Sequence, residues 1–179
     1  MPATTYILLF RGVGGATQLP TAPLRAALSA AKFDRVATYI NSGNAIVSSP
    51  LPREKVVAAV AEICRKQFGF SKAIFAITDR EWSKLIANNP FPKPAMNTPK
   101  FVHAAVLEKK PTAAAIAAVR EHAVPGEGFE VVGLVAYLHT PFGFGTSKLA
   151  VKFDSKIGVL NTARNWNTVL KLRDLVSHE

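Results

Sequence analysis

The sequence is poor in cysteine: Cys64 is the only one in 179 residues. A single thiol excludes an intramolecular disulfide framework and a zinc site built from several cysteines. It also predicts a reducing, cytoplasmic setting. Cys64 lies in an apolar helical stripe that carries no cationic side chain at helical spacing, so we expect a small core residue rather than a nucleophile.

Long hydrophobic runs are also lacking. Residues 6–10 form an apolar segment with no basic residue before it, which is unlike a secretory signal. Residues 113–119 and 131–138 are far shorter than the roughly 18 residues of a membrane helix. With apolar runs this short, we expect no membrane partner. The four histidines are scattered without ligand spacing, so we expect no metal site, and we expect no cofactor.

Acidic residues are few: the chain has 12 Asp and Glu against 22 Lys and Arg, and its formal net charge is +10. The excess is even along the chain, with 11 basic and 5 acidic residues in 1–90 and 11 and 7 in 91–179. No basic tail exists, so an anionic ligand or nucleic acid would meet a folded surface. The oligomeric state stays open.

The first half of the chain alternates strand and helix patterns. A buried strand at 4–10 is followed by a helix that Thr21 can cap, and by two short strands at 36–40 and 45–48 around a tight turn. A helix that Gly69 should end and a strand at 71–77 complete a βαββαβ order, and a Thr78–Glu81 capping box opens one further helix.

Residues 88–100 contain four prolines and little periodicity, which predicts an extended connection. We therefore expect a first subdomain at 1–88, a Pro-rich connection at 89–100 and a second subdomain at 101–179. The second half repeats the order, with a hairpin around Gly133, a helix from Ser147 to Lys156, a brief strand at 159–162 and a final helix. The fold class is α+β, with two ferredoxin-like (βαββαβ) subdomains in tandem, packed together.

Two turns of the first half are candidates for anion binding. The loop after the first strand contains Arg11, Gly12, Gly14 and Gly15, whose backbone N–H groups can turn toward a phosphate. It lacks the third glycine of a dinucleotide fingerprint and the ending of a Walker loop, so a purely structural turn is the alternative. The hairpin turn contains Ser42, Gly43 and Asn44, and it too is either part of a binding site or a purely structural turn.

Two segments of the second half are candidates as well. Ser147 and Lys148 follow a Gly-rich loop at a helix start, where Lys148 is an anion contact or a solvated lysine. Arg164, Asn165 and Trp166 crowd together where the last helix begins. A cap explains Asn165 and a core anchor explains Trp166, but neither explains Arg164. His103, within an apolar strand, is expected to be a core or face residue.

Four segments, FRGVGG, TYINSGN, YLHTPFGFGTSKL and TARNWNTVLKL, occur in this order. In combination they resemble the bacterial family called domain of unknown function 1697, over about Tyr6 to Leu172. The resemblance implies two ferredoxin-like subdomains and no known activity. It marks a set of signature positions without assigning them a role: Arg11, Gly14, Gly15, Ser42, Gly43, Asn44, Ser147, Lys148, Arg164, Asn165 and Trp166.

The charge and the turns favour binding of a phosphate-bearing ligand, RNA or a nucleotide, in a basic composite cleft. Two alternatives stay open. One is an enzyme that acts on a small anionic substrate held by Ser42, Asn44, Arg164 and Asn165. The other is a non-catalytic scaffold or oligomeric interaction module. Whether the protein is an enzyme is not decided by any motif.

The expected geometry separates the two turns of the first half. We expect the second strand to run antiparallel to the first, which would place Arg11 and Ser42 at opposite ends of one sheet. Arg164 would then be the neighbour of one of them in a composite site.

Overall fold

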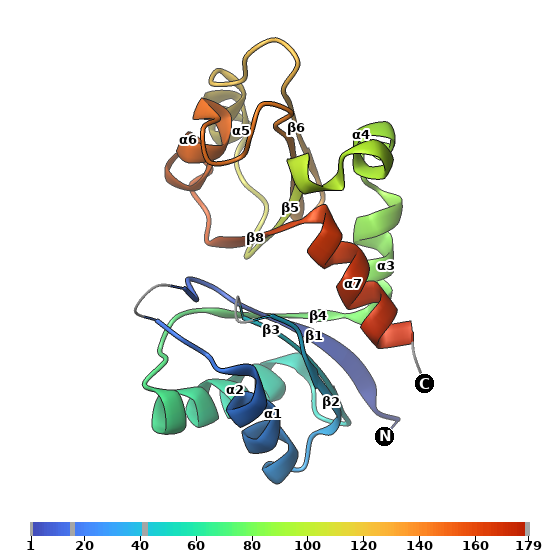
Figure 1. Cartoon of the computed structure of the whole chain (residues 1–179). Helices are drawn as coiled ribbons and strands as arrows, with labels where there is room; N and C mark the ends of the chain where they lie inside the picture. Colours follow the sequence, from blue (N-terminus) through green and yellow to red (C-terminus); the bar gives the residue numbers. More distant parts are fainter. Residues whose placement is uncertain (1, 15–16, 41–42, 178–179) are drawn as a thin grey trace. The chain divides into compact units, whose positions relative to one another are not determined.

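A computed structural model describes residues 2–14, 17–40 and 43–177 (Figure 1). Its contacts divide the chain into two compact units. Unit 1 consists of Met1–Lys84 and Leu172–Glu179, and unit 2 of Leu85–Lys171. The division falls inside two helices, α3 (Asp79–Ala87) and α7 (Trp166–Ser177), so the last helix is shared by the units.

Unit 1 contains a four-stranded antiparallel sheet with the order β2-β3-β1-β4. Helices α1 and α2 lie on one face of this sheet (Figure 1). The elements follow the chain as β1 (Thr4–Phe10), α1 (Thr21–Ala30), β2 (Asp34–Thr38), β3 (Asn44–Ser49), α2 (Arg53–Phe68) and β4 (Ile74–Thr78). This is the ferredoxin-like order expected from the sequence.

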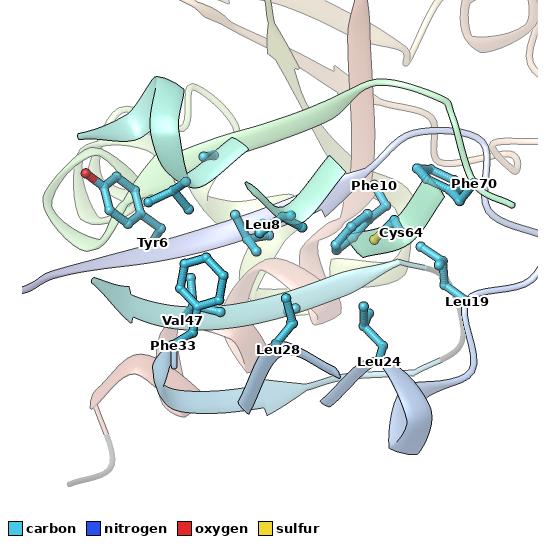
Figure 2. Packing of buried hydrophobic residues seen from close by; sticks show 14 residues of the cluster. Tyr6, Leu8, Phe10, Leu19, Leu24, Leu28, Phe33, Val47, Cys64 and Phe70 are labelled. Atoms are coloured by element: carbon cyan, nitrogen blue, oxygen red, sulfur yellow. The ribbon is translucent and has the colours of Figure 1, made fainter. Parts of the chain in front are cut away.

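The core of unit 1 forms between the sheet and its two helices. Alternation along β1 turns Leu8 and Phe10 to the same face, where Figure 2 shows them with Leu24 and Leu28 of α1. Cys64 of α2 is fully buried in the same cluster, and burial raises the pKa of its thiol to about 11. The expectation of a core cysteine is therefore confirmed, since a buried thiol with this pKa is a poor nucleophile.

The expected direction of the second strand was wrong. Both β1 and β2 pair antiparallel with β3, which lies between them, so β1 and β2 run parallel to each other. The turn after β2 therefore lies at the same end of the sheet as the loop after β1. The helix α1 returns the chain to the end of the sheet at which β1 begins, so β2 runs in the direction of β1. A hairpin would have given a second strand of the opposite direction.

Unit 2 repeats the arrangement with the strand order β6-β7-β5-β8. Helices α5 and α6 lie on one face of its sheet (Figure 1), over a core that contains Ala105, Leu138, Leu149 and Phe153. The elements are β5 (Val102–Leu107), α5 (Ala113–Arg120), β6 (Gly128–Val132), β7 (Val135–His139), α6 (Lys148–Lys156) and β8 (Asn161–Asn165).

The repeat extends to individual backbone hydrogen bonds at the ends of the central strands. In unit 1, Phe10 N donates to Gly43 O and Arg11 N donates to Ala73 O, each at 2.9 Å. In unit 2, Leu107 N donates to Leu134 O and Glu108 N donates to Leu160 O, also at 2.9 Å. The two halves are thus structural copies, and the position of Gly43 in unit 1 corresponds to that of Leu134 in unit 2.

Two local expectations were wrong. The Pro-rich segment is not simply extended, because it forms α4 (Pro92–Asn97) and a 3-10 turn, Pro99–Phe101. Pro92 and Pro94 fall in the first turn of α4, where the missing N–H groups would be unsatisfied in any case. The last strand begins later than expected and includes Arg164, because β5 offers backbone partners as far as His103. No helix among the described residues is long and apolar enough to cross a bilayer.

Candidate functional site

Three connections of unit 1 meet at one end of its sheet. Their described residues are 11–14 and 17–20 after β1, 39–40 and 43 between β2 and β3, and 69–73 before β4, and we call these the glycine end. The bonds from Phe10 N to Gly43 O and from Arg11 N to Ala73 O join the three. The glycine end thus brings together segments that are up to sixty residues apart in sequence.

Gly43 allows the hairpin turn to approach the end of β1 closely. Its φ of +77° lies in the left-handed region, and a Cβ added there would lie 2.8 Å from both Phe10 Cβ and Val13 Cγ2. No larger side chain fits at this contact. The glycine therefore fixes the turn against the loop after β1.

Lys72 is held across the same loop. Its Nζ donates a hydrogen bond to Gly12 O at 3.3 Å, and a Cβ added to Gly12 would lie 2.9 Å from Lys72 Cδ. The absence of a side chain at Gly12 thus lets the lysine stem cross the loop. The ammonium group of Lys72 and the guanidinium of Arg11 both belong to the glycine end.

The glycine end contains no aspartate or glutamate in any of its three connections. Most acidic residues of unit 1 lie at the opposite end of the sheet, at the starts of β2, α2 and α3: Asp34, Glu54, Asp79 and Glu81. Glu62 lies within α2, where hydrogen bonds from Arg65 and Lys66 lower its pKa to about 2. Cations are also found among these acidic residues, as the ion pair between Arg53 and Glu81 shows, whereas the charged side chains of the three connections are all cationic.

The N-terminus of α1 also lies at the glycine end, because α1 runs antiparallel to the strand that precedes it. Thr21 is the first helical residue rather than the cap that we expected, and Pro20 at the cap position offers no side-chain hydrogen bond. No acidic residue occupies the first turn. The partial positive charge of this helix end adds to the two cations.

Not every expected residue of the two turns can be placed. Gly15 and Ser42 lie outside the described residues. Asn44 is 1% exposed, and its Nδ2 donates to Tyr39 O at 3.1 Å. The Asn44 amide therefore stabilises the hairpin, which is a structural role.

Ser147 and Lys148 lie at the start of α6 in unit 2. The Ser147 hydroxyl accepts a hydrogen bond from Ala150 N at 3.2 Å, which makes it a helix N-cap. Lys148 is exposed in the first turn. The structure thus gives Ser147 a local role and leaves Lys148 accessible to solvent.

The structure gives three different positions to the residues of this segment: Arg164 lies in β8, Asn165 caps α7 and Trp166 is buried. Arg164 Nη1 donates to Thr162 Oγ1 and to Ala163 O, each at 2.8 Å, and burial lowers the pKa of its guanidinium to about 10. Asn165 caps α7, because its Oδ1 accepts from Thr168 N at 3.1 Å. Trp166 is 4% exposed. A site shared by Arg164 and the turns of unit 1 would involve both units, and it stays a prediction.

His103 stacks on Phe144 with ring centroids 3.8 Å apart. Burial lowers its pKa to about 4, so the imidazole is neutral at pH 7. This position agrees with the expected core or face residue. Among the residues that the structure describes, no three His, Cys, Asp or Glu side chains gather in a group that could hold a metal ion.

A comparison with protein-family models matches residues 3–137 to the family described as Protein of unknown function (DUF1697). The chain belongs to this family. The match covers the segments FRGVGG and TYINSGN of this DUF1697 chain and ends at Tyr137, before the Ser147–Lys148 and Arg164–Trp166 segments.

Solved structures similar to this DUF1697 chain include that of the conserved bacterial protein SP0830 from Streptococcus pneumoniae. It is 19% identical, the match covers 98% of this chain and 100% of that chain, and the TM-score is 0.74, which supports the fold. Protein BT0572 from Bacteroides thetaiotaomicron gives 8% identity over 98% of this chain and 96% of that one, with a TM-score of 0.19. No curated protein matches.

Sequence reasoning on the DUF1697 chain missed Lys72. The available signal was topological, because the fourth strand of a βαββαβ unit pairs with the first in the antiparallel sense. The residue before strand four must then lie beside the residue after strand one. Lys72 could have been assigned to the same sheet end as Arg11 on that basis.

Proposed function

We propose that the glycine end of unit 1 binds the phosphate group of a phosphate-bearing ligand. The observation that supports this is the local charge: Arg11 and Lys72 lie in neighbouring connections at one sheet end, and these connections contain no aspartate or glutamate. An anion there is attracted by these two side chains and by the N-terminus of α1, and the three connections themselves contribute no carboxylate.

The two cations have complementary properties. The Arg11 guanidinium can donate two parallel hydrogen bonds to a phosphate, while Lys72 acts as a point charge. Both lie on backbone that is fixed by the bond from Arg11 N to Ala73 O. The binding energy is modest, because Lys72 is exposed and its interaction with an anion is screened by salt.

A small ligand fits this site better than RNA bound across a sheet. RNA-recognition modules of this fold place exposed aromatic side chains on the sheet face opposite the helices. On the central strands β1 and β3 of unit 1 the side chains on that face are aliphatic, as Ile7, Leu9 and Ile46 show, and Phe75 of the edge strand β4 is the aromatic beside Leu9. The central strands therefore carry no aromatic pair on which bases could stack, which favours a ligand bound at the loops.

The test is isothermal titration calorimetry of the full chain with inorganic phosphate, nucleotides and single-stranded RNA at about 50 mM salt. We expect phosphate-bearing compounds to bind, and Arg11→Ala and Lys72→Ala each to weaken binding about tenfold. Lys55→Ala is the matched control, since Lys55 is an exposed lysine at the opposite end of the sheet. Equal binding by all three variants would contradict the site.

We also propose a cytoplasmic location in bacteria for this activity. The single cysteine is buried and reduced, which suits a compartment that keeps thiols reduced. The similar structure from Streptococcus pneumoniae is of a conserved bacterial protein. Localisation of a tagged chain by fractionation tests this directly.

A further inference from the structure

Ile40, at the glycine end, has a backbone conformation that its side chain disfavours. Its φ is +45°, in the left-handed region, and its side chain is 46% exposed. A β-branched residue is a rare outlier in this region, because its Cβ substituents crowd the backbone. Glycine or asparagine would adopt the same turn at a lower cost in free energy.

Two other described non-glycine residues, Lys32 and Arg35, also have a positive φ. Lys32 follows the C-terminus of α1, where Lys32 N and Phe33 N donate to Ser29 O and Leu28 O and close the helix end. Arg35 lies at the bulge of β2, and its guanidinium donates to Val176 O at 3.0 Å. Neither is β-branched.

The conformation of Ile40 is imposed by its neighbours. Tyr39 N donates to Asn44 O at 3.1 Å, and Asn44 Nδ2 donates back to Tyr39 O at 3.1 Å. These bonds fix the backbone on both sides of the turn. They account for the turn but not for an exposed isoleucine at this position, and strained residues of this kind cluster at ligand sites.

The position of Ile40 relative to the cations is set by the sheet. Ile40 follows the edge strand β2, and β3 separates β2 from β1. The ends of β2 and β1 are therefore two interstrand spacings apart, roughly 10 Å. Half-buried Val13 lies on the loop between, where its Cγ2 faces Gly43. Ile40 and Val13 thus supply apolar side chains at the same sheet end as Arg11, and the strand spacing between Ile40 and Arg11 is of the order of the length of a small ligand.

We propose that Ile40 contacts the part of the ligand that is not phosphate, so that the ligand is a small phosphomonoester with a planar apolar group, such as a nucleoside monophosphate. This inference depends on the proposed phosphate site. The cations hold the phosphate, and the exposed isoleucine covers one face of the apolar group, removing it from water. The backbone strain at Ile40 is then retained for binding.

The experiment compares adenosine 5′-monophosphate with inorganic phosphate by calorimetry on the full chain and on two variants. We expect the nucleotide to bind more tightly than inorganic phosphate. Ile40→Asn should lower the affinity for the nucleotide about tenfold and leave that for phosphate unchanged. Its melting temperature should stay equal or rise, because asparagine tolerates positive φ. Ile40→Val, which keeps an apolar β-branched side chain, should hold nucleotide affinity within about twofold.

The outcomes separate the inference from the function on which it depends. If Ile40→Asn leaves nucleotide affinity unchanged, or lowers both affinities equally, Ile40 is not a ligand contact and the phosphate site stands. The same holds if the wild-type protein binds the nucleotide no more tightly than phosphate. If the wild-type protein binds neither compound, the phosphate site is wrong, and the inference is wrong with it.

Discussion

At the scale of single residues, Gly43 is the position where a side chain would be most disruptive. Gly43→Ala would combine a positive φ with a Cβ only 2.8 Å from Phe10 Cβ and Val13 Cγ2. We expect the free energy of unfolding to fall by roughly 3 kcal/mol in chemical denaturation. Gly69→Ala is the control, because Gly69 has a similar φ of +63° with nothing within 4 Å, and it should cost about 1 kcal/mol.

A second residue, His103, makes stability depend on pH. Its pKa falls from 6.5 to about 4 on folding, so the unfolded chain binds more protons between these values. The free energy of unfolding therefore rises with pH through this window. The contribution is complete above about pH 6.5 and is lost toward pH 4, with a magnitude on the order of 3 kcal/mol.

Denaturation curves at several pH values test this, with His103→Phe as the comparison. Phenylalanine keeps a ring against Phe144 and cannot be protonated. Burial also lowers the pKa of His139, but that effect is present in both proteins. A variant whose stability varies with pH as steeply as that of the wild type would show that His103 is not responsible.

At the residue scale, glycines needed for positive φ could be recognised in the sequence more readily than the unusual backbone conformation of another residue type. The glycines at 12, 14 and 43 were recognised, because glycine is the residue that positive φ demands. Ile40 was not, since its conformation is imposed by hydrogen bonds across the turn and contradicts its own preference. Lys72 was missed because its position depends on strand pairing and not on the residues around it in sequence.

At the scale of elements, the helix N-caps allow a test of whether Ser147 stabilises a helix or binds a ligand. Ser147 accepts from Ala150 N, and Thr112 accepts from Ala115 N at the start of α5. We expect Ser147→Ala to lower the free energy of unfolding by about 1 kcal/mol, as the matched variant Thr112→Ala should, without changing phosphate binding. Weaker phosphate binding by Ser147→Ala alone would instead assign Ser147 to a ligand site. Thermal denaturation and calorimetry on the same samples separate the two results.

Element boundaries followed from local pattern where a cap or a periodic stripe marked them. Thr78 and Glu81 form the expected capping box, in which Thr78 N and Oγ1 donate to Glu81 Oε2 and Glu81 N donates to Thr78 Oγ1. Gly69 ends α2 as expected. The Pro-rich segment misled, because prolines were counted as helix breakers without regard to their place in the first turn of α4.

At the scale of the whole molecule, the βαββαβ order of each half was predictable and its consequence for the site was not. The hydrophobic periodicities of the helices and strands can be read directly from the sequence. The direction of β2, by contrast, depends on which strand it pairs with. That one error moved the two glycine turns to opposite sheet ends in the expected geometry. The observed topology unites them, and this union is the basis of the proposed phosphate site.

The end of the chain provides the last prediction, because α7 starts in unit 2 and its residues from Leu172 onward belong to unit 1. Leu172 is fully buried, and Val176 O accepts the hydrogen bond from Arg35 in β2. Loss of this segment removes the buried side chain of Leu172 and the acceptor of the hydrogen bond from Arg35. Unit 2 keeps its own core around Leu138 and Phe153.

We therefore expect deletion of residues 172–179 to lower hydrogen-exchange protection of the amides in β1–β4 by at least tenfold and to change β5–β8 much less. Leu172→Ala is the milder variant, with an expected cost of about 3 kcal/mol, and exposed Lys171→Ala is its control. Uniform loss of protection across both sheets would mean that the two units unfold as one cooperative body. The segment would then stabilise the whole chain rather than the sheet of unit 1.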